Sequence, residues 1–154
     1  MPTPKRIFIS YSHRDDPFLE ELRLHLKPMQ REGLILPWTD RAVEGGNEWD
    51  KEIREQLETA DIILLLVSPA FLASDYCWDV EMVRAMERHE AGSARVIPII
   101  LRIGDEWRKA PFAKLKALPE DAKPVTTFKD QDEAWTSVVS GIRRVVASMN
   151  AAKS

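Results

Sequence analysis

Residues 74 to 82, SDYCWDVEM, hold the densest group of chemically capable side chains in this sequence. Three carboxylates, Asp75, Asp79 and Glu81, lie among a tyrosine, a tryptophan and the lone cysteine, Cys77. Acidic residues at the start of a helix interact favourably with its dipole, by about 0.3–1 kcal/mol. That effect is a sufficient reason for Asp75 and Asp79. Whether Glu81 serves the helix in the same way or does chemistry is a question that these residues alone leave open.

Glu81 and Cys77 each have a structural alternative. Glu81 is spaced to pair with Arg84 three residues later on the same helix, an interaction worth only about 0.2–0.5 kcal/mol. Cys77 is a potential nucleophile, but no base is evident near it in the sequence, and isolated cysteines are usually inert core residues. We therefore do not expect Cys77 to act as a nucleophile.

Several familiar catalytic motifs are missing from the sequence. It contains neither a GxGxxG nor a GxxxxGK[ST] phosphate-binding motif, and neither a GxSxG nor an HExxH motif. The histidines, His13, His25 and His89, are far apart and lack the spacing of metal ligands. We therefore expect no metal site. Only His13 directly follows a predicted strand, where it would face a functional crevice.

Composition narrows the class of protein. The chain has 154 residues, of which 44% are apolar and 31% charged, as in a globular domain. Its net charge of −3 disfavours nucleic acid as a partner. The longest apolar run is far too short to cross a membrane, and the first residues do not resemble a signal peptide. We expect one cytoplasmic domain over residues 1–154, with a core from about 6 to 149.

Apolar runs alternate with helical patterns along the chain. Short runs rich in β-branched residues predict four strands, at residues 6–11, 34–38, 62–67 and 95–101. A weaker fifth strand is predicted at residues 125–128. Apolar residues at helical spacing predict four helices, which begin near Asp16, Trp49, Asp75 and Gln131.

This alternation predicts an α/β fold of the flavodoxin-like type. We expect a three-layer sandwich, with helices on both faces of a five-stranded parallel sheet of order 2-1-3-4-5. In such folds the functional crevice lies outside the carboxyl ends of the strands. The polar segments expected there are residues 12–15, 39–49, 68–81 and 102–107.

Three of these strand ends carry recognisable sequence. RIFISYSHRDD surrounds the first, WTDRAVEGGNEWDKEI follows the second, and ADIILLLVSPAFLASDYCWDVEM covers the third strand and its helix. Together, and in this order, they closely resemble a TIR (Toll/interleukin-1 receptor) domain of the bacterial type. The resemblance extends from Ile7 to about Val146.

The resemblance implies an activity. Many TIR domains cleave NAD at the bond between nicotinamide and ribose, and in those members the essential residue is a glutamate early in the helix after the third strand. Glu81 matches that position. The family usually has a tryptophan four residues before this glutamate. Here Cys77 occupies that place and Trp78 comes one residue later.

The chemistry of this reaction suits a single carboxylate. Nicotinamide leaves as a neutral pyridine, so no general acid is needed, whereas ordinary glycosidases use two carboxyl groups. Positive charge develops on the ribose, and a fixed carboxylate stabilises it, with a contribution of about 3–4 kcal/mol. NAD+ is then the substrate, and no other cofactor is expected.

The resemblance also suggests residues that contact the substrate, namely Tyr11, Ser12, His13, Asp40, Trp49 and Cys77. Structural alternatives stay open for three of them. Tyr11 is equally suited to the core, Asp40 either bonds a ribose or caps a turn, and Trp49 either stacks on a ring of the substrate or packs internally.

Partners are suggested by the same resemblance. TIR domains associate with one another through the loop that corresponds to Asp40 to Trp49, and in the cleaving members assembly completes the site. We therefore expect self-association and a fused or paired sensor domain. The expected role is bacterial immune signalling, such as antiphage defence, or virulence. One alternative is a non-catalytic TIR scaffold. Another is a different flavodoxin-like protein, such as an FMN binder or a relative of nucleoside deoxyribosyltransferases.

Overall fold

The sheet has four parallel strands in the order β2-β1-β3-β4. The computed structural model describes residues 3–39, 49–104 and 107–152. Its strands are β1 (Lys5–Ser10), β2 (Ile35–Trp38), β3 (Ile62–Val67) and β4 (Arg95–Ile100). The α/β class, the parallel sheet and the order of these strands agree with the prediction.

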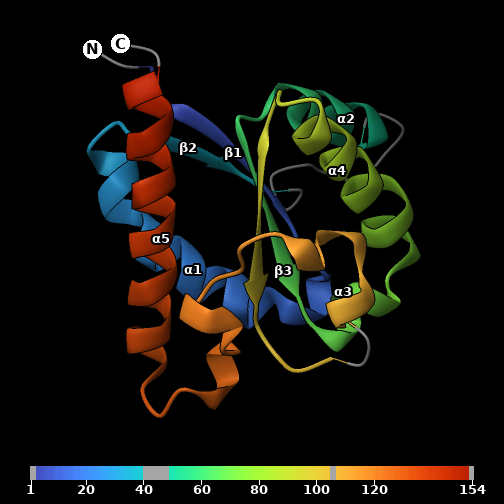
Figure 1. Ribbon diagram of the computed structural model, residues 1–154, viewed down its shortest axis with the longest axis vertical. Coiled ribbons are helices and arrows are strands. Elements are labelled where there is room, and N and C mark those ends of the chain that lie inside the picture. Colours follow the sequence, from blue (N-terminus) through green and yellow to red (C-terminus); the bar gives the residue numbers. More distant parts are fainter. Residues whose placement is uncertain (1–2, 40–48, 105–106, 153–154) are drawn as a thin grey trace.

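Helices cover both faces of the sheet. They are α1 (Asp16–Arg31), α2 (Trp49–Thr59), α3 (Pro69–Ala73), α4 (Val83–Glu90) and α5 (Gln131–Ala152). In Figure 1, α1 and α5 lie on one side of the sheet, and α2, α3 and α4 lie on the other. This is the predicted three-layer arrangement.

β3 is the centre of the core. All six of its residues are buried, as expected of an inner parallel strand covered on both faces. Leu64 and Leu66 pack into the layer of α1 and α5, which also contains Trp135. Ile63 and Leu65 pack into the opposite layer of α2 and α4.

The predicted fifth strand at residues 125–128 is wrong. This segment contains a short 3-10 helix, η7 (Val125–Thr127), directly after Pro124. Proline has no N–H to donate to a strand ladder, which disfavours a regular strand here. Instead, Leu118 forms an isolated parallel bridge with Ile99. Among the described residues, the sheet therefore has four strands, and β4 lies at its edge.

The remaining short helices lie mostly in the connection after β4. They are the 3-10 helices η1 (His13–Asp15), η4 (Trp107–Lys109), η5 (Pro111–Lys114) and η6 (Glu120–Ala122). The helix predicted from Asp75 is present, but part of it is a π-helical segment, η3 (Cys77–Met82), which α4 continues.

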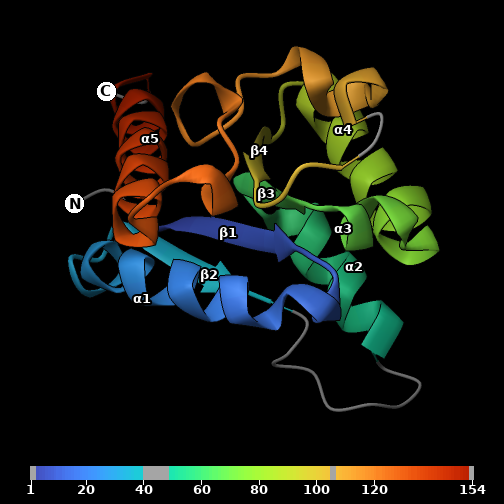
Figure 2. The ribbon, with the colours of Figure 1, turned by 90° about the horizontal axis from the view of Figure 1, so that it is seen from below.

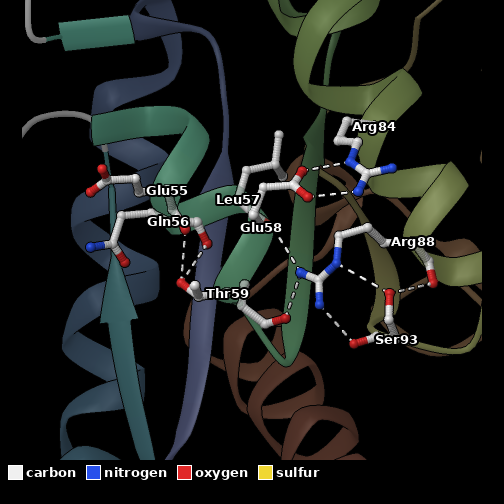
Figure 3. Close-up of polar contacts among 9 residues, drawn as sticks. Glu55, Gln56, Leu57, Glu58, Thr59, Arg84, Arg88 and Ser93 are labelled. Carbon is white, nitrogen blue, oxygen red and sulfur yellow. Dashed lines mark hydrogen bonds and ion pairs between the residues drawn. The ribbon is translucent and has the colours of Figure 1, made fainter. Parts of the chain in front are cut away.

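Arg88 joins α2 to α4 (Figure 3). Its side chain is buried, and its Nη1 donates to the main-chain oxygens of Leu57 and Ala60, both at 2.7 Å. Its Nη2 donates to the main-chain oxygen of Ser93 at 2.8 Å. The guanidinium therefore satisfies carbonyls at the C-terminal end of α2, which have no partner within that helix.

We predict that Arg88→Ala lowers the free energy of unfolding by about 2–3 kcal/mol, because it leaves buried carbonyl groups without a donor. Arg84→Ala is the matched control: Arg84 forms an exposed pair with Glu58 on the same two helices. Urea unfolding of both variants measures the difference. Equal losses would show that the bonds from Arg88 to buried carbonyls stabilise the fold no more than the exposed ion pair of Arg84 does.

The pair of Glu58 and Arg84 predicts a pH dependence. A hydrogen bond from the Arg84 side chain lowers the pKa of Glu58 from its usual value. A carboxyl whose pKa is lower in the folded state stabilises the fold above its unfolded pKa, and this contribution is lost as the pH falls through the folded pKa.

We therefore expect the stability difference between the wild type and Arg84→Ala to be constant above about pH 5 and to shrink below about pH 4. Urea unfolding at a series of pH values measures it. A difference that stays unchanged in acid would contradict the role of the Glu58 charge.

Candidate functional site

The candidate site lies at the carboxyl ends of the strands. Figure 2 shows the end of β1 beside α3, which follows β3. Ser10 is the last residue of β1, Ser68 directly follows β3, and Arg102 is the second residue after β4. Parallel strands bring them to one edge of the sheet, which is where α/β proteins bind ligands.

Glu81 is held at this edge by Ser10. The Ser10 hydroxyl donates to Oε1 of Glu81 at 2.6 Å. The Glu81 side chain is 3% exposed and Ser10 is 1% exposed. The carboxylate is thus oriented by the last residue of β1 and shielded from water.

The π-helical segment η3 carries Glu81. Within it, Cys77 and Glu81 are buried while Asp79 is exposed. Asp75, just before the segment, is also exposed. The widened turn of a π-helix occurs often at functional sites. Among these carboxylates, one is thus buried and two are exposed, and the catalytic role predicted for Glu81 stays a prediction.

Cys77 lies against β1 rather than in an open site. Its buried thiol donates to the main-chain oxygen of Tyr11 at 3.5 Å. Trp78, the next residue, is half-buried and its ring meets Phe112 edge-on, with centroids 6.3 Å apart. Neither placement adds support for contact with a substrate.

Of the candidates after β1, Tyr11 is a core residue. It is 3% exposed, packs with α1, and its hydroxyl donates to Asp16 at 2.9 Å. Ser12 is half-buried and accepts a hydrogen bond from the main-chain nitrogen of Arg14 at 3.3 Å. His13 is exposed, with its ring 5.3 Å from that of Tyr11. His13 is therefore the accessible member of this group.

Two further candidates are not placed. Asp40 lies outside the described residues, as does the rest of the segment 40–48. Trp49 begins α2, and its side chain lies outside what the structure describes. Their predicted contacts with a substrate, and the predicted association loop, stay predictions.

A second buried carboxylate at this edge, Asp15, is absent from the site residues that the sequence predicts. It is 1% exposed and accepts hydrogen bonds from the Ser68 hydroxyl and from Arg102 Nη2, the latter at 3.0 Å. Ser68 also accepts from the main-chain nitrogen of Phe71 at 3.0 Å and so caps α3. Asp15 thereby connects the chain segments that follow β1, β3 and β4.

The sequence does carry a signal for the network of Asp15, Ser68 and Arg102. Asp15, Ser68 and Arg102 all belong to the polar segments expected at the strand ends, and charged residues are almost never fully buried unless paired. The position of Asp15 just before a helix favours a capping role instead, but its side chain makes no capping hydrogen bond with α1.

The sequence matches a known family over most of its length. The model of the TIR domain family matches residues 7–138. The chain belongs to the TIR domain family. A relative from Sinorhizobium fredii, the uncharacterised protein y4lF, is 50% identical over 137 residues, which cover 89% of this chain and 42% of the relative. This TIR domain thus spans less than half of that relative's length.

Membership of the TIR family removes the other flavodoxin-like alternatives. TIR domains mediate homotypic interactions in signalling, and bacterial members can cleave NAD. In the described part of the chain, no helix combines the length and the apolar character that crossing a membrane requires.

We predict that Asp15→Ala destabilises this TIR domain by about 2–3 kcal/mol, because Ser68 and Arg102 lose their acceptor. The loss stays moderate because Arg102 is 38% exposed and regains water. Asp79→Ala, at an exposed carboxylate, is the control and should change stability little. Thermal and urea unfolding measure both, and similar values for the two variants would contradict the network's role.

Proposed function

We propose that this TIR domain cleaves NAD+ at the nicotinamide–ribose bond, releasing nicotinamide and either ADP-ribose or a cyclic isomer. The observation that carries the proposal is the position of Glu81. Its buried carboxylate lies at the carboxyl edge of the sheet and is oriented by Ser10 at 2.6 Å.

The proposed mechanism needs one carboxylate. As the bond to nicotinamide breaks, the leaving group takes the bonding electrons and departs as a neutral pyridine, while the ribose gains positive charge. Glu81 would face this charge with its orientation already fixed by Ser10, so little reorganisation is needed during the reaction. Water, or a nitrogen of the adenine, then captures the ribose carbon.

Access to Glu81 requires a rearrangement. At 3% exposure, the carboxylate has almost no contact with solvent. A substrate can reach the carboxylate only after it is uncovered. Self-association is the natural trigger for this rearrangement, because TIR domains bind one another. We propose that the segment from Asp40 to Trp49 makes this contact, so that an isolated domain is slow and an assembled one is active.

The wider context is also a proposal. Because the chain covers 42% of the Sinorhizobium relative, we propose that such proteins join a TIR domain to a sensor. We propose cytoplasmic immune signalling or virulence as the setting, with NAD+ as the substrate and no separate cofactor.

A non-catalytic scaffold is the second candidate function. The hydrogen bond between Ser10 and Glu81 also favours this alternative, because a carboxylate that is bonded to Ser10 and shielded from water can have a purely structural role. In that case the domain would bind other TIR domains and leave NAD+ intact.

We expect concentrated, assembled protein to release nicotinamide from NAD+, and Glu81→Gln to lower the rate by at least about 10²-fold, the usual effect of removing a transition-state electrostatic contact. Asp79→Asn is the matched control, because its carboxylate belongs to the same segment but is exposed. Chromatography of the products measures release and separates linear from cyclic ADP-ribose.

Each outcome of this experiment decides between the candidates. Release by the wild type and the control, but not by Glu81→Gln, supports the enzyme. If assembled wild-type protein releases nothing, the domain is a scaffold. If Glu81→Gln keeps full activity while folded, Glu81 does not carry the reaction.

A further inference from the structure

A cavity lies beside β4, at the edge of the sheet and away from the residues around Glu81. It has a volume of about 400 Å³ and is bordered by β4, α5 and residues 115–118. Figure 2 labels both β4 and α5. We name it the β4–α5 pocket. Its lining includes Val96, Ile97, Leu118 and Val145.

One wall of the β4–α5 pocket is held by close packing. A side-chain carbon added at Gly141 of α5 would lie only 2.6 Å from a methyl group of Leu118. The absence of a side chain at Gly141 thus lets α5 approach Leu118 directly. Leu118 is in turn fixed to β4, because its main-chain oxygen accepts from Ile100 at 2.8 Å. Leu118 is therefore held between α5 and β4, and with Val96, Ile97 and Val145 it forms the apolar floor of the pocket.

The rim of the pocket is basic. Among its described lining residues, the ionisable groups are His89, Arg95, Lys116 and Arg144, with no carboxylate. The protein as a whole has a net charge of −3, so this is a local concentration of positive charge. Arg144 uses its Nη2 to bond Glu120 at 2.6 Å, but a guanidinium has further N–H donors.

The backbone of β4 favours a small ligand over an added strand. A strand would need to pair with the outer N–H groups of β4. The N–H of Val96 already donates to Nδ1 of His89 at 3.2 Å. This N–H is therefore not available to pair with an added strand.

We propose that the β4–α5 pocket binds a small organic anion with an apolar body, such as a medium-chain carboxylate. The apolar floor receives the hydrocarbon part, and Arg95, Lys116 and Arg144 receive the charged group. The volume lies at the lower end of the range for ligand sites, about 300–1,000 Å³, which suits a ligand of this size.

Decanoate, kept below its micelle concentration, is the probe, and calorimetric titration of the folded domain is the measurement. We expect saturable binding at one site and at least tenfold weaker binding of decanol, which lacks the charge. The double variant Arg95→Gln/Lys116→Gln should weaken decanoate binding at least tenfold. The matched control, Lys27→Gln/Arg31→Gln, makes the same charge change at exposed positions of α1 and should bind like the wild type.

A second pair of variants tests the location. Ser148 lines the pocket, so Ser148→Trp should fill it and abolish binding, whereas Ser140→Trp, at an exposed position of α5 outside the lining, should not. Circular dichroism verifies that all variants fold. The proposal is overturned if decanoate does not bind, if decanol binds equally well, or if each control changes binding as much as its partner variant.

Discussion

The arrangement at the carboxyl edge of the sheet depends on one buried charge. Asp15 accepts hydrogen bonds from Ser68 and Arg102, which follow β3 and β4, and it lies itself in the segment after β1. A buried carboxylate needs such donors, because removing a charge from water is costly. Three chain segments are therefore held together where the α/β fold places its ligand site.

Glu81 lies at the same edge of the sheet as Asp15. It reaches Ser10, the last residue of β1, from a π-helical segment in which its neighbour Asp79 faces solvent. Asp15 accepts from Arg102 at 3.0 Å, and Glu81 accepts from the Ser10 hydroxyl at 2.6 Å. In the proposed reaction, the bond to Ser10 would fix the orientation of the Glu81 carboxylate before positive charge develops on the ribose.

The β4 edge of the sheet lacks the fifth strand that the apolar pattern predicts. Prolines and 3-10 turns occupy the connection after β4, and Leu118 makes only a single bridge to Ile99. Beside this edge lies a pocket with an apolar floor and a basic rim. The outer N–H groups of Val96 and Ile100 bond His89 and Leu118, so this edge has partners other than a neighbouring strand.

The sequence by itself determined the fold class and the positions of four strands and the long helices. These features depend on local patterns: an apolar run such as residues 62–67 specifies a buried strand wherever it lies. Only the tertiary structure decided that Ser10 bonds Glu81, that Tyr11 is core, that Asp15 joins Ser68 and Arg102, and that residues 125–128 form no strand. The physical reason is that such partners are separated by up to 87 positions, and their pairing is set by how the layers pack.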